Sequence, residues 1–189
     1  MAAFFYRAHM KKSPFLATLV VTVCFLVSSS AQGATPKSLG KFGYWQTYLL
    51  YEGKAPVCYM TLTAQPPRKK KGGNKRGKVV LMITHRPAES AYDVVSYSIG
   101  TKFKPSSDVA FKADGKTFNL FTKADTAWAW NSATDRALTH ALRKDYSVII
   151  KGKTSSGEKV SDEVSLKGSN NAYKQISKAC DITIRKLGK

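Results

Sequence analysis

The sequence has 189 residues, with 31 Lys and Arg against 12 Asp and Glu, and a formal net charge of +19. Its 43% apolar residues and its 11% aromatic residues exclude a disordered chain, and its length suits one domain with a hydrophobic core. The positive excess favours anionic partners, but charge alone also fits a basic protein that has no specific ligand.

The first 33 residues have the layout of a secretory signal peptide. Phe15–Val27 is apolar, basic residues precede this run, and small residues follow it. A membrane span needs about 20 apolar residues, so the run is short for the alternative, a retained anchor. We predict cleavage after Ala31 or after Gly33. The rest of the chain is then exported into an oxidising compartment.

The signal-peptide pattern also suggests where the chain starts and how it divides into segments. Met10 is an alternative start to Met1, because two lysines follow it directly, as in an ordinary signal peptide. We predict a polar leader at residues 34–41, one folded domain at residues 42–182, and a basic tail at residues 183–189. The oligomeric state does not follow from the sequence.

Cysteine counting suggests a disulfide. Cys24 lies in the apolar run and leaves with the signal peptide, so Cys58 and Cys180 are the cysteines of the exported chain. Two cysteines in an exported domain most economically pair with each other, and free thiols or an intermolecular bridge are the alternatives. A bridge that closes so long a loop contributes about 4–5 kcal/mol in the chain-entropy treatment.

Alternating apolar residues predict a mostly β domain, a sandwich of short strands. Asp114-Gly115 predicts a tight hairpin turn, because this pair tolerates positive φ angles. The predicted strands are Tyr44–Tyr51, Val57–Thr63, Val79–Thr84, Tyr92–Ile99, Val109–Phe111, Thr117–Phe121, Thr126–Trp130, Tyr146–Ile150 and Val160–Leu166.

Two short helices complete the predicted fold. Asn131–Lys144 has an apolar stripe that includes Leu138 and Leu142, and Ser132 is its expected cap. Ser169–Cys180 places its cysteine on the packed side of the helix. A disulfide to Cys58 would therefore hold this C-terminal helix on the first hairpin.

The sequence shows no arrangement typical of catalysis. His85 and His140 are interpreted as structural or surface residues, because no cluster of chemical groups surrounds either in the sequence. We predict no catalytic residue, no cofactor and no metal site, and we keep an unrecognised hydrolase as an alternative because triads assemble from distant positions. The acidic residues are scattered and are expected mostly in turns: Asp93, Asp114, Asp125, Asp135 and Asp162.

The basic stretch between Pro67 and Val79 is the predicted anion-binding segment. It contains seven cationic residues and no acidic one, so we expect an exposed loop that contacts phosphate or sulfate groups of lipids or glycans. The alternative is a solvated loop without a ligand. Aromatic residues are absent from the stretch, which argues against specific nucleic-acid binding. The candidate residues are Arg68, Lys69, Lys70, Lys71, Lys75, Arg76 and Lys78.

Several short motifs resemble one known family, the exported invasion-associated locus B proteins of Gram-negative bacteria. The similarity covers about residues 42–181. The motifs are Phe42-Gly43-Tyr44-Trp45, Val57-Cys58-Tyr59, Arg86-Pro87-Ala88-Glu89, Ile99-Gly100, Phe103-Lys104-Pro105, Ala127-Trp128, Lys151-Gly152, Ser156-Gly157, and Asp162 to Gly168 followed by Ala172, Ile176 and Ala179-Cys180.

The resemblance implies an immunoglobulin-like β-sandwich, a location in the periplasm or at the outer membrane, and for some members a role in entering host cells. It implies no catalytic residues. We therefore expect an exported non-enzymatic envelope protein that binds anionic envelope or host-surface components, with peripheral membrane contact. The alternative is a structural or stress-related periplasmic domain without a specific ligand.

Overall fold

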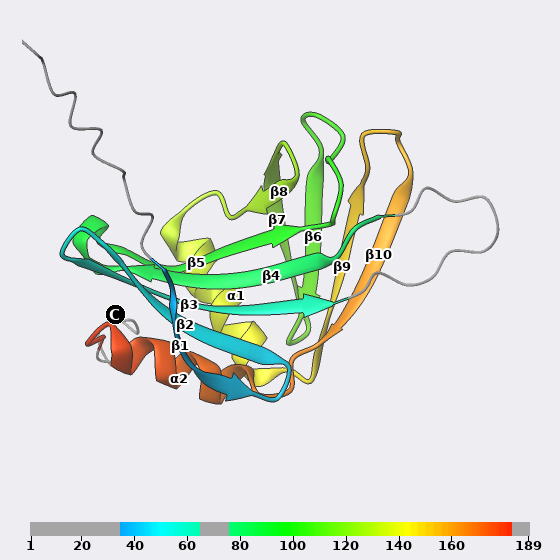
Figure 1. The fold of residues 1–189 in the computed structure, drawn as a ribbon. Coiled ribbons are helices and arrows are strands. Elements are labelled where there is room, and N and C mark those ends of the chain that lie inside the picture. The colour runs from blue at the N-terminus through cyan, green and yellow to red at the C-terminus, as the bar shows by residue number, and fades with distance from the viewer. Residues whose placement is uncertain (1–34, 65–75, 183–189) are drawn as a thin grey trace, which may run out of the picture. The chain divides into compact units, whose positions relative to one another are not determined.

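The computed structural model describes residues 35–64 and 76–182, and the statements below concern these residues (Figure 1). The predicted signal peptide and the basic tail lie outside them. In the described part of the chain, no helix is long and apolar enough to cross a membrane. The elements in chain order are β1 (Lys37–Phe42), β2 (Trp45–Glu52), β3 (Ala55–Ala64), β4 (Val79–Arg86), the 3-10 turn η1 (Pro87–Glu89), β5 (Ala91–Ser98), β6 (Asp108–Ala113), β7 (Lys116–Lys123), β8 (Thr126–Trp128), α1 (Ser132–Lys144), β9 (Ser147–Lys153), β10 (Lys159–Ser165) and α2 (Ser169–Ala179).

The strands of the described residues form one antiparallel sheet in the order β1-β2-β3-β4-β5-β8-β7-β6-β9-β10. In Figure 1, β4 and β5 run across the direction of β6, β9 and β10, so the second half of the sheet folds over the first. The predicted mostly β, sandwich-like fold with two short helices is confirmed. Its hydrogen bonding is continuous, because β8 pairs with both β5 and β7 and joins the two halves.

Alternation along each strand builds the core between the two halves. In β4, Val79, Leu81 and Ile83 point inward and are buried, and the residues between them are partly exposed. The halves meet where the ring of Tyr97 on β5 packs edge-on against Phe111 on β6, with 5.5 Å between ring centroids. Burial of this alternating set explains why the sequence pattern located most strands.

Helix α1 packs on β5 through the buried side chains of Leu138 and Leu142. It begins one residue earlier than the predicted cap would place it. The side-chain oxygen of Asn131 accepts a hydrogen bond from the Thr134 N–H at 2.9 Å, so Asn131 and not Ser132 is the cap.

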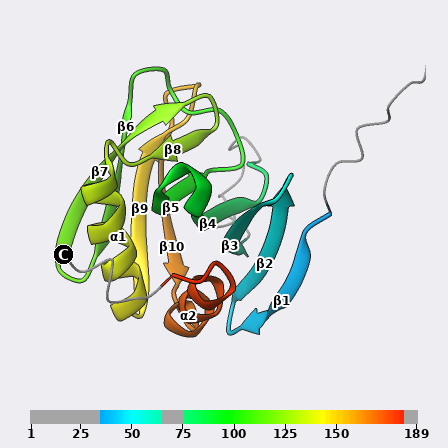
Figure 2. The same ribbon diagram turned by 90° about the vertical axis from the view of Figure 1, so that its left-hand side faces the viewer.

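Helix α2 covers the inner face of the first strands. Figure 2 shows it beside β2 and β3, and Tyr173 and Ile176 are buried on its packed side. A disulfide joins Cys58 of β3 to Cys180, the residue that ends α2, with 5.9 Å between the two Cα atoms. The predicted tether of the C-terminal helix is confirmed.

The predicted polar leader is wrong over most of its length. Lys37–Phe42 is an edge strand that pairs with β2, and the register shifts between Ser38 and Gly40. Pattern analysis missed this strand because its side chains are mostly exposed and show no apolar alternation, so backbone hydrogen bonds to β2 define it.

Two glycines let the turn after β1 touch the turn before α2. Gly43 and Gly168 both have positive φ. A Cβ on Gly43 would lie 2.2 Å from the carbonyl oxygen of Lys167, and one on Gly168 would lie 2.1 Å from that of Phe42. These positions belong to two motifs that are far apart in the sequence, and the fold brings them into backbone contact.

Removal of the disulfide tests how strongly it stabilises the domain. We expect the C58A/C180A variant to lose about 4–5 kcal/mol of unfolding free energy, because the bridge joins residues 122 apart and restricts the unfolded chain. Urea titration followed by tryptophan fluorescence measures the loss. Wild-type protein in reductant should unfold like the variant, and a variant as stable as the oxidised protein would contradict the expectation.

Candidate functional site

The structure changes the interpretation of the predicted basic segment. Arg68, Lys69, Lys70, Lys71 and Lys75 lie outside the described residues, so their predicted role stays a prediction. Arg76 and Lys78 are described, and they differ sharply in exposure. Lys78 is exposed, whereas the side chain of Arg76 is 5% exposed.

Arg76 forms a buried ion pair and is not available as a surface anion-binding residue. Its guanidinium donates to both carboxylate oxygens of Asp162, at 2.5 and 2.8 Å, and to the carbonyl oxygen of Ile99 at 3.2 Å. The hydrogen bond to Asp162 raises the pKa of Arg76 further above its ordinary value. The prediction for Arg76 is therefore corrected: its charge is neutralised inside the fold.

Asp162 is the centre of this contact. It lies in the middle of β10, inside the strand predicted at Val160–Leu166, and its side chain is 1% exposed, so the expectation that acidic residues lie mostly in turns is wrong for it. The hydroxyl of Tyr97 on β5 also donates to Asp162. Burial, together with this hydrogen bond, raises the pKa of Tyr97. The Arg76–Asp162–Tyr97 group thus links the segment before β4 to β5 and β10 through charge-assisted hydrogen bonds.

A second buried polar group lies beneath the helices. His85 on β4 is fully buried and is the direct cross-strand partner of Cys58. The backbone N–H of Asp93 donates to its Nδ1 at 3.1 Å, so Nε2 carries the proton and faces the Ser177 hydroxyl oxygen at 3.4 Å. The Asp93 carboxylate accepts a hydrogen bond from the Tyr173 hydroxyl at 2.7 Å. Asp93 is buried in β5, inside the strand predicted at Tyr92–Ile99.

Ser177, His85 and Asp93 contain the residue types of a hydrolase triad but lack its arrangement. A general base must offer an unprotonated nitrogen to the serine, and here the protonated nitrogen faces Ser177. The carboxylate that would orient the ring is bonded to Tyr173 instead. His85 is buried and His140 on α1 is exposed, which agrees with the interpretation of each as either a structural or a surface residue.

Asp135 is a third buried acidic group. It accepts a hydrogen bond from the Val95 N–H at 2.9 Å, which ties α1 to β5. Burial raises its pKa to about 6. Among the described residues, no group of three or more His, Cys, Asp or Glu side chains could hold a metal ion.

A cluster of lysines lies on the outer face of β9 and β10. Lys151, Lys153 and Lys159, named the lysine face here, are all exposed and point away from the core. Lys153 and Lys159 are direct cross-strand partners. A fourth lysine, Lys104, lies nearby, because its backbone N–H donates to the Lys153 carbonyl oxygen at 2.9 Å. None of the three forms an ion pair with a described residue.

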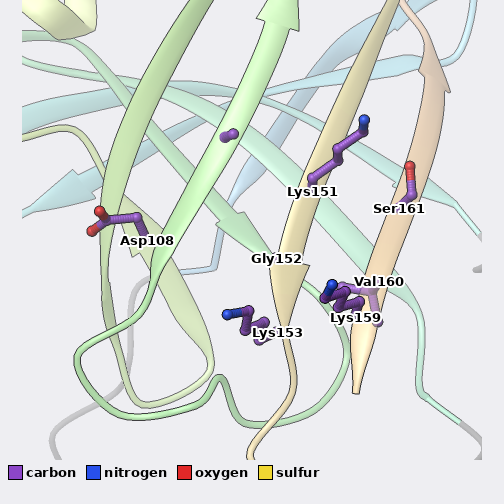
Figure 3. A pocket seen from close by; sticks show the side chains of 8 residues that line it. Asp108, Lys151, Gly152, Lys153, Lys159, Val160 and Ser161 are labelled. Carbon is purple, nitrogen blue, oxygen red and sulfur yellow. The ribbon is translucent and has the colours of Figure 1, made fainter. Parts of the chain in front are cut away.

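A hollow of about 330 Å³ opens at the lysine face. Figure 3 shows the lysines beside Ser161, with Asp108 across on β6. The residues that line it are Asp108, Ala110, Lys151, Gly152, Lys153, Lys159, Val160 and Ser161.

Sequence analysis did not single out these lysines. The signal was the period-2 pattern Lys151-x-Lys153 and Lys159-x-Ser161 on either side of a Ser-Ser-Gly turn. A cationic cluster with hydroxyl groups at its edge can bind phosphate, sulfate or carboxylate groups of a ligand.

The comparisons with known proteins place the chain in a family. The family model described as "Invasion associated locus B (IalB) protein" matches residues 45–177. The chain belongs to the invasion associated locus B family. A solved structure of invasion associated protein b from Bartonella henselae is similar in fold, with a TM-score of 0.55 and 12% sequence identity. The match covers 77% of this chain and 97% of that one. A search of curated proteins gives no match.

Loss of the buried Asp162 charge should destabilise this family member strongly. We expect Asp162→Asn to lower the unfolding free energy by about 3–5 kcal/mol, because the buried Arg76 guanidinium keeps its charge and loses its counter-ion. Urea unfolding measures the effect. The control is Glu52→Gln, whose partner Arg86 is 35% exposed, and it should cost less than about 1 kcal/mol. Similar losses in both variants would contradict a dominant role for the buried pair.

His85 should make stability depend on pH. Burial, and secondarily the charge of Arg143, lower its pKa from 6.5 to about 4, so between these values the unfolded chain binds a proton that the folded chain does not. The contribution of His85 to stability is therefore complete above pH 6.5 and falls as the pH drops towards 4. Asp135 has the opposite effect on stability between pH 3.8 and about 6. In this range its carboxyl keeps its proton in the folded chain and loses it in the unfolded chain, so its contribution to stability falls as the pH rises.

NMR titration of the His85 ring nitrogens separates the two contributions. We expect a neutral ring down to a midpoint near pH 4. A midpoint at 6.5 would show that the ring is not desolvated in the folded protein. The His85→Gln variant should lose the part of the pH dependence of stability that comes from the ring.

Proposed function

We propose that this protein is an exported, non-enzymatic envelope protein that binds anionic envelope or host-surface components through the lysine face. The observation that carries the proposal is the direct pairing of Lys153 with Lys159 on an exposed face that also contains Lys151. Like charges directly opposite each other on neighbouring strands are destabilising. Folding alone does not favour this arrangement, whereas an anion bound between the ammonium groups would offset the repulsion.

The covalent chemistry of the domain supports export. Cys58 and Cys180 form a disulfide, and such bridges persist in oxidising compartments such as the periplasm or the cell surface. The proposed signal peptide at residues 1–33 would deliver the chain there. We therefore propose a location in the periplasm or at the outer membrane.

Family membership supports a role at the bacterial surface. The similar Bartonella henselae structure has a title that calls that protein invasion associated. For the present protein we propose that binding of anionic surface components contributes to contact with host cells. Lys78, which is exposed just before β4, is a further cation that an anionic component could contact.

Chromatography on immobilised lipopolysaccharide tests the lysine face. We expect the exported wild-type protein to bind at low salt. The K151Q/K153Q/K159Q variant should elute at a lower salt concentration than the wild type, because it makes fewer charge contacts and less salt is needed to screen them. The matched control is K37Q/K41Q/K174Q, which removes three exposed lysines from β1 and α2 and should elute near the wild type. Equal elution of the two triple variants would show that net charge, and not this face, governs binding.

Fractionation of cells gives the corresponding test in the native setting. A protein held by charge should leave the membrane fraction in a high-salt wash. Recovery of wild-type protein entirely in osmotic-shock fluid, without salt, would contradict binding to the envelope.

A further inference from the structure

An aromatic pair, one ring exposed and one partly exposed, shares the outer face of the sheet with the lysines. The ring of Phe121 on β7 lies 4.9 Å from that of Trp130, centroid to centroid. Trp130 follows the end of β8 and is 63% exposed, so the predicted strand Thr126–Trp130 stops earlier, at Trp128. No catalytic or core-packing role explains a tryptophan exposed to this degree.

The strand register places this pair and the lysine face on one continuous surface. Phe121 is the cross-strand partner of Asp108, which lies two residues before Ala110 on the same face of β6. Ala110 is the partner of Lys151, and Lys151 is the partner of Ser161. The surface therefore runs over β7, β6, β9 and β10, about 14 Å at a spacing of about 4.8 Å between strands.

From this arrangement we propose that the face binds an acidic oligosaccharide, with a sugar ring packed on Phe121 and Trp130 and its acidic groups on the lysine face. The inference rests on the proposed function and names the ligand class of the same site. Aromatic rings pack well against the apolar C–H faces of sugar rings, and ammonium groups bind sulfate or carboxylate. The surface extends across four neighbouring strands, which suits a linear ligand.

Asp108 favours a sugar over a simple anion. Its exposed side chain lies between the aromatic pair and the lysines and lines the same hollow. A carboxylate there repels a bare phosphate or an anionic lipid surface, but it accepts hydrogen bonds from sugar hydroxyls. The combination of carboxylate, lysines and aromatic rings matches a ligand that carries both hydroxyl and acidic groups.

A nucleic-acid strand fits the surface less well. Single-stranded nucleic acids bind on successive aromatic platforms, one for each stacked base. Here one aromatic pair lies at one end of the surface, and the hollow beside it is lined by lysines, an aspartate, a serine and small apolar residues. The observations thus favour a short acidic glycan.

Calorimetry with two matched polyanions tests the inference on the exported full chain. The probes are a heparin-derived octasaccharide and a polyphosphate of equal charge. We expect Trp130→Ala to weaken octasaccharide binding roughly fivefold and to leave polyphosphate binding unchanged, and Trp130→Phe to restore most of the affinity. Tyr146→Ala, which removes an aromatic side chain from a residue 91% exposed at the other end of β9, should behave as wild type.

The lysine variants separate failure of this inference from failure of the proposed function. K153Q/K159Q should weaken both probes, whereas K37Q/K41Q should not. If K153Q/K159Q weakens both probes but Trp130→Ala changes neither, the glycan inference is wrong and the proposed function stands. If K153Q/K159Q binds both probes as well as K37Q/K41Q does, or if the wild type binds neither, both are wrong. If a DNA octanucleotide binds more tightly than the octasaccharide and this binding depends on Trp130, the ligand is a nucleic acid and the glycan inference is wrong.

Discussion

The contact among Arg76, Asp162 and Tyr97 links the two halves of the sheet where they fold over each other. Arg76 lies in the segment before β4, Asp162 in β10 and Tyr97 in β5, so their hydrogen bonds join the last strand to β5 in the first half of the sheet. Removing these charges from water is costly, and the cost is offset only by close pairing and by full use of the donors and acceptors. Both carboxylate oxygens of Asp162 are used, and Arg76 also reaches the carbonyl oxygen of Ile99. Because Asp162 is fixed on the inner side of β10, the strand presents Lys159 on its outer side.

The other end of the core is held by a covalent bond and by neutral hydrogen bonds. Cys58 and His85 face each other on β3 and β4, and Ser177 lies one helical turn before Cys180. The disulfide therefore sets Ser177 over the His85 ring. Because the Asp93 N–H already occupies Nδ1, the ring donates to Ser177 and does not accept from it. The same residue types that could form a catalytic group here serve to pack α2 on the sheet.

Local patterns predicted the elements whose burial alternates in the sequence. β4 shows this well, and the two cysteines could be paired by counting. β1 was missed because backbone pairing with β2 defines it and its side chains are mostly exposed. Patterns of this kind depend on burial and on turn residues. They therefore cannot predict a strand that is defined by backbone hydrogen bonds alone.

The candidate site depended on contacts between distant residues. Arg76 lies in a run of cations in the sequence, and its partner Asp162 is 86 residues away, so only the fold shows that this charge is buried. The lysine face was visible as a local period-2 pattern, but its like-charged pair required the β9–β10 register. The approach of Trp130 to Phe121 likewise requires the pairing of β7 with β8.

The two outer strands of the sheet are poorly suited to pairing with another chain. β1 has an irregular register at Gly40 and carries the exposed Lys37 and Lys41, and β10 directs the charge of Asp162 inward. Bulges, edge lysines and inward charges all discourage edge-to-edge association of sheets. The sheet can thus remain open at both edges without nucleating fibres, even where copies of the protein are crowded together.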